Sequence, residues 1–199
     1  MPHHTRFDIL RHGEPEGEDC FRGSGVDHPL TASGWQQMQA AIAQGTQWDL
    51  IISSPLSRCL EFAKKTAAKM SIELIIDDQL KEIGFGVWEG RTKEEIQLHD
   101  TEAYKRFRLN PVENRPDGAE PLEKFSNRIW HKLEQLASQH PSKRILIIAH
   151  AGVIRVVFAK TMGLTLDDVY NRLKIEYAAS ISCSFNDKGR ASLLLPSSL

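Results

Sequence analysis

The sequence predicts an α/β fold in which a mostly parallel sheet lies between two layers of helices. Short apolar segments alternate with longer amphipathic ones along the 199 residues, and the connections between them are short. Such alternation is typical of parallel strands joined by helices. Residues 145–149 are continuously apolar, as expected for a strand covered on both faces. Two short apolar segments near the C-terminus predict a hairpin. We therefore expect a three-layer α/β/α sandwich whose sheet has an antiparallel edge.

The expected strands are short segments that can be buried, and in chain order they cover residues 7–10, 48–52, 72–76, 144–149, 181–185 and 191–195. The expected helices cover residues 31–45, 58–70, 121–140 and 151–158, with shorter helices within 92–110. Loops rich in Gly, Pro and charge are expected over 14–25 and 111–121. Thr31 can cap the first helix and Gly45 is placed to end it. Pro121 suits the first turn of the long amphipathic helix, and Pro141 ends that helix.

Length and composition predict one domain over residues 1–199, with 41% hydrophobic and 26% charged residues. The net charge of −1 gives no electrostatic reason to expect nucleic acid or an anionic membrane as a partner. No apolar run approaches the roughly 20 residues that span a bilayer. Three widely spaced cysteines fit free thiols in a reducing compartment. The N-terminus lacks the pattern of a secretory signal, so we expect a cytoplasmic protein with a small ligand.

Polar side chains follow three of the expected strands at their carboxyl ends. Arg11 and His12 follow the first strand, Arg58 opens the helix after the second, and His150 follows the fourth. Ligands bind at this edge of open α/β sheets. A surface arginine without a role is the alternative for Arg58, but a cation in the first turn of a helix is disfavoured unless an anion lies nearby. Two planar guanidinium groups suit a tetrahedral phosphate, so the four side chains predict a phosphate site.

A histidine in such a site can attack phosphorus, provided that its reactive nitrogen is unprotonated. His12 is the expected nucleophile, because adjacent arginines favour its neutral form. His150 would donate to the phosphoryl oxygens in the transition state. The leaving alkoxide needs a proton, which a carboxyl group can supply before it activates water. Glu82 stands among apolar residues and glycines and suits this role, although physical reasoning alone also leaves Glu14 and Glu89 open.

Four short motifs in this order carry a family resemblance: Leu10-Arg11-His12-Gly13-Glu14, Ser53-Ser54-Pro55-Leu56-Ser57-Arg58, Glu82 ahead of Phe85-Gly86-Val87-Trp88-Glu89-Gly90, and Ala149-His150-Ala151-Gly152. Together they resemble the phosphoglycerate mutase-like branch of the histidine phosphatase superfamily. The resemblance implies the phosphoglycerate mutase-like fold. It also implies that His12 is the phosphorylated nucleophile, that Glu82 is the proton donor, and that the phosphate pocket is formed by Arg11, Arg58 and His150. It implies no metal and no dissociable cofactor. The remaining histidines also lack His-x-x-x-His spacing.

Within the superfamily, the short chain and residues 80–90 are most similar to the α-ribazole phosphatase group, which removes the 5′-phosphate of α-ribazole phosphate in cobalamin assembly. A broad-specificity sugar or nucleotide phosphatase and a phosphoglycerate mutase are alternatives. A phospholigand-binding module without catalysis is a further alternative, because a fold can keep its pocket and lose its chemistry. Residues 92–121 are expected to select the small phosphorylated substrate. The oligomeric state is open, and the edge at the C-terminal hairpin is where a homodimer contact is expected.

Three further residues complete the expected substrate contacts. Gly13 is expected to let the backbone pass close to phosphate, so that a side chain there harms turnover before folding. Gly152 lies at a helix N-terminus, where backbone N–H groups favour anions. Many family members have Ser or Thr where this chain has Pro15, so a phosphate contact from that loop is missing. Arg22 is expected to replace it if the loop folds inward.

Overall fold

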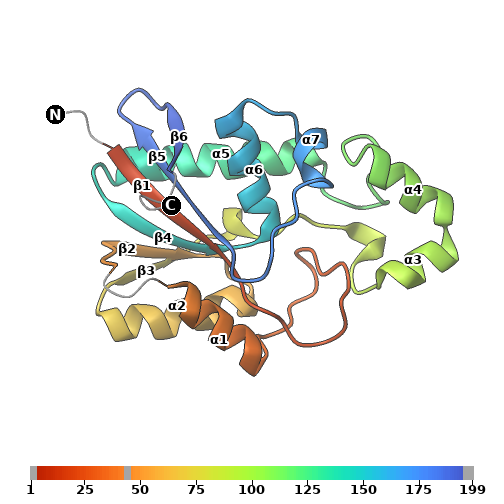
Figure 1. Ribbon diagram of the computed structural model, residues 1–199, viewed down its shortest axis with the longest axis horizontal. Coiled ribbons are helices and arrows are strands. Elements are labelled where there is room, and N and C mark those ends of the chain that lie inside the picture. Colours follow the sequence, from red (N-terminus) through yellow and green to blue (C-terminus); the bar gives the residue numbers. More distant parts are fainter. Residues whose placement is uncertain (1–3, 43–45, 195–199) are drawn as a thin grey trace.

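The computed structural model describes residues 4–42 and 46–194 and has a six-stranded sheet in the order β3-β2-β4-β1-β5-β6 (Figure 1). The strands are β1 (His4–Arg11), β2 (Leu50–Ser53), β3 (Glu73–Ile76), β4 (Arg144–Ala149), β5 (Ser180–Asn186) and β6 (Ala191–Leu194). The pairs β1–β4, β2–β4 and β2–β3 are parallel, whereas β5 runs antiparallel to β1 and β6 antiparallel to β5. The expected mostly parallel sheet with an antiparallel edge is confirmed.

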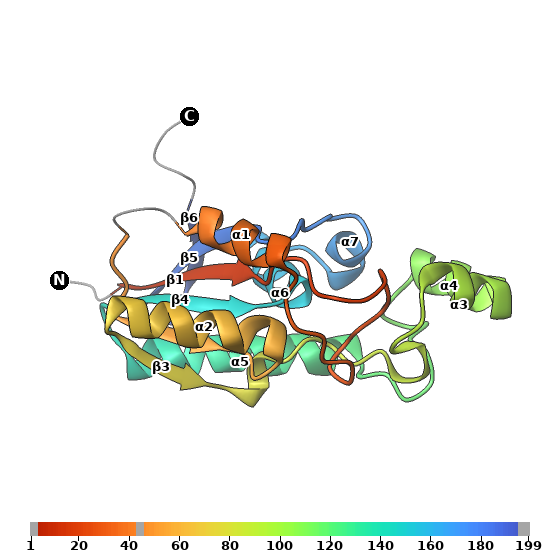
Figure 2. The ribbon, with the colours of Figure 1, turned by 90° about the horizontal axis from the view of Figure 1, so that it is seen from below.

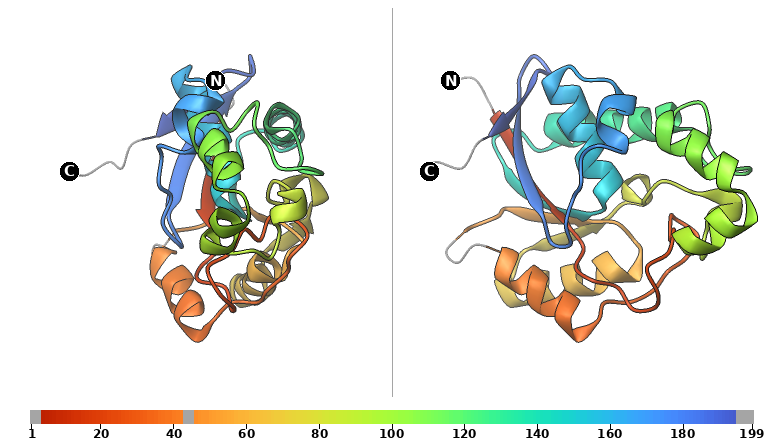
Figure 3. Two further views of the ribbon diagram at one scale, coloured as in Figure 1. Left: turned by 90° about the vertical axis from the view of Figure 1, so that its right-hand side faces the viewer. Right: turned by 45° about the vertical axis from the view of Figure 1, so that its right-hand side comes forward.

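Helices cover both faces of this sheet (Figures 1 and 2). They are α1 (Ala32–Ala41), α2 (Ser57–Met70), α3 (Lys93–His99), α4 (Thr101–Leu109), α5 (Leu122–Gln139), α6 (Ala151–Met162) and α7 (Leu166–Tyr170), with 3-10 turns η1 (Asp78–Leu80) and η2 (Gly86–Trp88). The pair α3 and α4 projects beyond one end of the sheet (Figure 3). Within the described ranges, no helix is long and apolar enough to cross a membrane.

The apolar strand residues point alternately into two cores, one on each face of the sheet. Ile145 and Ile147 of β4 pack in the core that also holds the apolar residues of α5 and α6. Leu146 and Ile148 pack in the core that holds Met38 of α1 and the buried residues of α2. These side chains are at most 3% exposed, and burying each contributes about 1.5 to 3 kcal/mol. Burial on both faces explains why residues 145–149 are apolar without alternation.

The helix ends follow local signals in the sequence. The Thr31 hydroxyl accepts a hydrogen bond from the Gly34 N–H at 2.9 Å, so the expected cap of α1 is confirmed. The expected stop at Gly45 lies outside the described residues. We did not expect α7, which begins with a capping box between Thr165 and Asp168. A helix this short leaves little periodicity in the sequence, so its capping residues are its main local signal.

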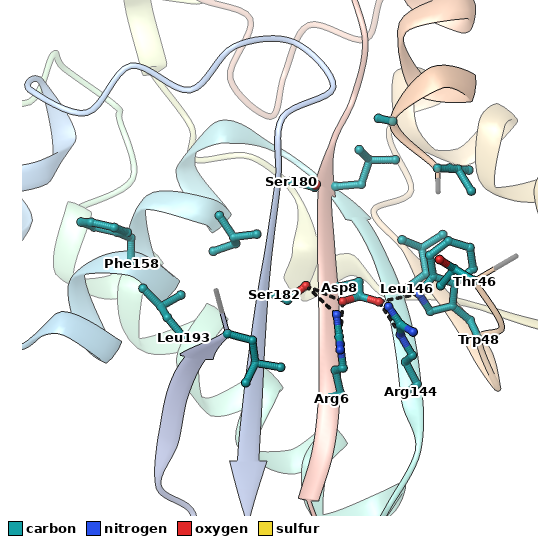
Figure 4. Close-up of a pocket in the computed structure, with 15 residues that line it drawn as sticks. Arg6, Asp8, Thr46, Trp48, Arg144, Leu146, Phe158, Ser180, Ser182 and Leu193 are labelled. Atoms are coloured by element: carbon teal, nitrogen blue, oxygen red, sulfur yellow. Dashed lines mark hydrogen bonds and ion pairs between the residues drawn. The ribbon is translucent and has the colours of Figure 1, made fainter. Parts of the chain in front are cut away.

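Asp8 is a buried carboxylate in the middle of β1, where an apolar strand was expected (Figure 4). It accepts hydrogen bonds from Ser182 Oγ at 2.5 Å, Arg144 Nε at 2.7 Å, Trp48 Nε1 at 2.8 Å and Arg6 Nε at 3.0 Å. Burial opposes ionisation of Asp8, but these four hydrogen bonds outweigh it and lower its pKa. The side chains of this Asp8 cluster join β1 to the neighbouring strands β4 and β5.

An aromatic cluster joins the α3–α4 pair to the loop after β1. The ring centroids of Phe21 and Phe85 lie 5.0 Å apart, those of Phe21 and Trp88 5.6 Å apart, and those of Trp88 and Phe107 5.1 Å apart, all with edge-to-face geometry. Phe21 thereby holds the loop close to residues 80–90. This contact encloses the carboxyl edge of the sheet on one side.

Candidate active site

The carboxyl edge of the sheet bears a cavity of about 190 Å³ that brings together most of the residues expected to form the site. Arg11, His12, Arg22, Arg58 and Glu82 all line it. Because β2, β4 and β1 are neighbours in the sheet, the segments that follow them meet at this edge. The convergence that the strand-end pattern predicted is therefore present in the structure.

His12 lies at the end of β1 and is 6% exposed. Its Nδ1 is 2.7 Å from the carbonyl oxygen of Gly13. A carbonyl oxygen only accepts, so Nδ1 carries the proton and Nε2 of the neutral ring has a free lone pair. Burial, followed by the nearby Arg58 and Arg11 guanidinium groups, lowers the pKa of His12 well below its usual value of 6.5. The ring is therefore neutral at pH 7.

His150 lies where β4 meets α6 and is completely buried. Its ring centroid is 5.3 Å from that of His12, with edge-to-face geometry. Nε2 of His150 is 2.7 Å from the hydroxyl oxygen of Ser54, and the Cys59 sulfur lies 3.7 Å from the same nitrogen. Burial, followed by the positive charge of Arg58, lowers the pKa of His150 well below 6.5. His150 is therefore a second neutral imidazole beside that of His12, but it is not among the residues that line the cavity.

Arg11 and Arg58 each have one buried nitrogen, Nε, with no hydrogen-bond partner among the described residues. Of the other two Arg58 nitrogens, Nη1 donates to the Val26 carbonyl at 2.9 Å and lies 3.9 Å from an Asp27 carboxylate oxygen, and Nη2 donates to the Gly23 carbonyl at 2.8 Å. Arg11 donates through Nη1 to the Ile175 carbonyl. Only 1% of the Arg58 surface is exposed, so this residue is not a surface arginine, which was the alternative considered from the sequence. Unpartnered buried donors in a cavity are suited to an anion.

The Glu82 carboxylate is fixed at the N-terminus of α6. It accepts from the Ile83 N–H at 3.0 Å and from the Gly152 N–H at 3.2 Å. A Cβ atom on Gly152 would lie 2.2 Å from a Glu82 oxygen and 2.9 Å from the Phe125 ring. Arg128 of α5 donates to the Glu82 carbonyl at 3.3 Å. The Gly152 N–H, which we expected to face the substrate, therefore holds Glu82 instead.

The other two carboxylates that the sequence left open have structural partners. Glu89 accepts from the backbone N–H groups of Ser24 at 3.1 Å and Phe85 at 2.9 Å. Glu14 accepts from the Thr31 hydroxyl at 3.3 Å. Of these three carboxylates, Glu82 lines the cavity and the other two hold the surrounding loops.

The structure gives Gly13 a physical reason besides the expected approach to phosphate. A Cβ atom there would lie 2.1 Å from the Gly34 carbonyl oxygen and 2.7 Å from its carbonyl carbon. Those atoms are backbone and belong to α1, so the close approach is between the loop and the helix. A side chain at Gly13 is therefore expected to disturb the packing of α1 together with turnover, rather than turnover first.

The loop after β1 folds inward and brings Arg22 to the cavity. Arg22 is 8% exposed, and its Nη2 donates to the carbonyls of Glu18 at 2.6 Å and Glu16 at 2.9 Å. Its Nε donates to Nδ1 of His28 at 3.3 Å. Arg22 thus ties the loop together, and its contact with phosphate stays a prediction.

Sequence reasoning missed several residues that surround the expected ones. Ser54 contacts His150, while Arg155, Tyr170 and Tyr177 line the cavity. The Arg11 guanidinium lies 4.2 Å from the centroid of the Tyr177 ring. Ser54 had a usable signal, because it follows a buried strand as His12 and His150 do. The two tyrosines come from segments with no distinctive spacing. Among the described residues, no three His, Cys, Asp or Glu side chains form a group that could hold a metal ion.

Comparison with protein families gives one match over nearly the whole chain. The model described as histidine phosphatase superfamily (branch 1) matches residues 7–196. This range contains all the residues that line the cavity.

Individual relatives agree with this match. A bifunctional protein of Mycobacterium tuberculosis is 28% identical over 195 residues, covering 96% of this chain and 53% of that protein. This chain thus spans about half the length of the first curated relatives that it matches. The adenosylcobalamin/alpha-ribazole phosphatase of Escherichia coli is 26% identical over 83% of both chains. The structure of a phosphoserine phosphatase from Entamoeba histolytica, in complex with 3-phosphoglyceric acid, matches with a TM-score of 0.81, 28% identity and 98% coverage of both chains.

Proposed function

This chain belongs to the histidine phosphatase superfamily, and we propose that it hydrolyses phosphomonoesters through a phosphohistidine intermediate. The observation that carries the proposal is the environment of His12. Its Nδ1 proton is engaged by the Gly13 carbonyl, which leaves Nε2 as the nucleophilic nitrogen in a cavity lined by arginines. The low pKa of the buried ring keeps that nitrogen unprotonated.

In the first half-reaction, Nε2 of His12 forms a bond to phosphorus and the bond to the ester oxygen breaks. The protonated Glu82 carboxyl gives its proton to the leaving alkoxide. In the second half-reaction, the Glu82 carboxylate takes a proton from water, and the resulting hydroxide displaces His12 from phosphorus. Inorganic phosphate leaves and both residues return to their starting states. Arg11 and Arg58 stabilise the negative charge of the phosphoryl oxygens throughout.

For the leaving alcohol we propose the ribose 5′-oxygen of α-ribazole 5′-phosphate. The similarity of residues 80–90 to that group and the Escherichia coli relative support this assignment. The walls of the cavity support it further, because Phe21, Phe85, Tyr170 and Tyr177 line it together with the arginines. Aromatic side chains bury and stack against flat rings such as a benzimidazole.

A second candidate is a phosphomonoester whose alcohol carries a carboxylate. Arg155 favours it, because this side chain is a fourth arginine in the cavity lining, together with Arg11, Arg22 and Arg58. Its Nε donates to the Leu173 carbonyl at 3.1 Å, which fixes the guanidinium beside the cavity. A guanidinium beyond those that hold the phosphate can pair with a carboxylate through two parallel hydrogen bonds.

Trapping of acid-labile phosphate tests the reaction. We expect wild type quenched during turnover of a labelled phosphomonoester to carry label, and His12→Ala to carry none. His131→Ala is a matched control, since this histidine side chain is 85% exposed. Absence of label on wild type with every phosphoester would refute the proposed enzymatic activity and favour the alternative of a phospholigand-binding module. Transfer between phosphoglycerate positions in excess of phosphate release would instead identify a mutase.

A substrate panel tests the alcohol. The values of kcat/KM are compared for α-ribazole 5′-phosphate, a nucleoside monophosphate, and the matched pair 3-phosphoglycerate and glycerol 3-phosphate, which differ in the carboxylate. We expect the highest value for α-ribazole 5′-phosphate. Preference for 3-phosphoglycerate over glycerol 3-phosphate that disappears in Arg155→Gln would support the second candidate. Comparable values on all four would indicate a broad-specificity phosphatase.

A further inference from the structure

Ser54 follows β2 at the same edge of the sheet where His12 follows β1 and His150 follows β4. It is completely buried. Its hydroxyl oxygen is 2.7 Å from Nε2 of His150 and 3.4 Å from the backbone nitrogen of Leu56. Among the hydrogen bonds of residues 4–42 and 46–194, these are the two contacts of that oxygen. In the hydrogen bond between Ser54 and His150, either the hydroxyl or the ring nitrogen can be the donor.

A neutral imidazole carries one proton, which either ring nitrogen can hold. At His12 the neighbouring group is the Gly13 carbonyl, which only accepts, so the proton must be on Nδ1. At His150 the neighbour is a hydroxyl, which can donate or accept. The tautomer of His150 therefore depends on the other contact of Ser54.

The backbone N–H of Leu56 decides this direction. It is a donor, so the Ser54 oxygen accepts there, and the hydroxyl proton still needs an acceptor. Nε2 of His150 is the acceptor within reach. If Nε2 carried the proton, the Ser54 hydroxyl would be a buried donor with no partner, which is unfavourable. Cys59 does not discriminate, because its sulfur lies 3.7 Å from Nε2 and 3.9 Å from Nδ1.

We propose that Ser54 is a positioning residue whose hydroxyl donates to Nε2 of His150 and holds this ring as the Nδ1–H tautomer. His150 then offers the Nδ1–H as the donor to a phosphoryl oxygen, a consequence that rests on the proposed function. Both histidines carry their proton on Nδ1, but with opposite results. His12 engages its proton with Gly13 and keeps a lone pair for phosphorus, whereas His150 engages its lone pair with Ser54 and keeps a proton for oxygen.

NMR of protein labelled with ¹⁵N in its histidines tests this assignment, because two-bond proton–nitrogen couplings distinguish the two tautomers. The His150 signals are those missing from His150→Asn. We expect the Nδ1–H pattern for His150 in wild type at pH 7 to 8. Ser54→Ala should shift the ring toward the Nε2–H form and lower kcat by about 10- to 100-fold, the range found when the hydrogen-bond partner of a metal-bound histidine is removed. Ser54→Thr, which keeps the hydroxyl, should keep the wild-type tautomer.

Ser53→Ala is the matched control. Ser53 is also completely buried and precedes Ser54, but its hydroxyl donates to the Ser54 carbonyl at 2.8 Å and not to a histidine. We expect wild-type tautomer and turnover for this variant. An Nε2–H pattern for His150 in wild type would overturn the proposal, as would an unchanged tautomer in Ser54→Ala. If Ser54→Ala does not fold, the wild-type spectrum decides alone.

The spectrum and the phosphate label fail independently. A wild-type protein that forms labelled phosphohistidine but shows the Nε2–H pattern would refute the role of Ser54 and leave the proposed function intact. A protein that shows the Nδ1–H pattern but forms no label with any phosphoester would support the contact and refute the proposed function.

Discussion

Two groups of polar side chains, one around the middle of β1 and one at its carboxyl end, differ in how completely they are hydrogen-bonded. The Asp8 cluster in the middle of the strand has four donors on one carboxylate. At the end of the strand, Arg11 and the nearby Arg58 of α2 each keep one buried nitrogen, Nε, that has no partner among the described residues. The first group is complete without a ligand, whereas the second is suited to an anion.

This difference separates stability from function along one strand. A completed network stabilises the fold, because each hydrogen bond to a charged group contributes about 1.5 to 3 kcal/mol. A cavity lined by four arginines and the neutral His12 costs stability, and functional sites commonly carry such a cost. Substitutions in the Asp8 cluster should therefore change folding, and those at the end of β1 should change turnover.

The largest effect is expected at His12. We expect His12→Gln to lower kcat by about 10⁴-fold or more, because the nucleophile is lost. The free energy of unfolding should change by less than about 1 kcal/mol, since the ring is neutral and, within the described residues, hydrogen-bonds only to the adjacent Gly13 carbonyl. Initial rates of phosphate release and urea denaturation measure the two quantities. His131→Gln should match wild type in both, and turnover above about one hundredth of wild type in His12→Gln would remove His12 from the chemistry.

The opposite result is expected in the middle of the strand. We expect Asp8→Asn to lower the free energy of unfolding by about 2 to 3 kcal/mol, because an amide cannot accept from both Arg6 and Arg144 as the carboxylate does. The value of kcat/KM, calculated per concentration of folded protein, should stay within about two-fold of wild type. Asp187→Asn, at an exposed aspartate in the β5–β6 turn, should change stability by less than about 0.5 kcal/mol. A folded Asp8→Asn variant that has lost turnover would contradict the separation, because it would show that the Asp8 cluster also supports the site at the end of β1.

The dependence of stability on pH should separate the groups in a single titration. The folded-state pKa values of His12 and His150 lie well below 6.5, so below that pH the unfolded chain binds protons that the folded protein does not. Stability therefore falls as the pH drops through 6.5, by about 1 kcal/mol per pH unit for each histidine. The lowered pKa of Asp8 adds stability that is present above its usual value of 3.8 and is lost below it.

Urea midpoints measured from pH 8 to pH 3 should thus decline in two stages. His12→Gln should reduce the slope of the first stage, and Asp8→Asn should reduce that of the second. A decline that begins only below about pH 4 in wild type would contradict the burial of two neutral histidines. Because His12 stays unprotonated, its titration should not cause a fall in kcat/KM as the pH drops through 6.5.

Much of the fold and of the site is encoded in local sequence signals. The strand β4 is apolar throughout because both its faces are covered, and His12, Arg58 and His150 follow strands whose order in the sheet makes them neighbours. Their convergence could therefore be predicted without knowing any contact. Glu82 could be distinguished from Glu14 and Glu89 only by the family pattern, because the N–H that holds its carboxylate belongs to Gly152, which is distant in sequence.

The remaining features depend on pairings that no local pattern reveals. Asp8 accepts from Ser182, and these residues meet only because β5 lies beside β1. Gly13 was predicted to approach phosphate, and no signal in the sequence indicated that it also packs against the Gly34 backbone. Ser54 shared the strand-end signal with the two histidines, yet its importance lies in a contact with His150 that the structure supplies.

The smallest effect is expected at Arg22, which has features of both groups. Like the Asp8 cluster it is hydrogen-bonded to neighbours, through the carbonyls of Glu16 and Glu18, and like Arg11 it lines the cavity. Because its donors are shared, we expect Arg22→Gln to weaken competitive inhibition by inorganic phosphate by only about 3- to 10-fold, equivalent to at most about 1.4 kcal/mol. Arg172→Gln, at a side chain that is 79% exposed, is the matched control and should not change the inhibition constant. An unchanged constant in Arg22→Gln with a lower free energy of unfolding would assign Arg22 to the structural group, because its role would then be to hold the loop rather than the phosphate.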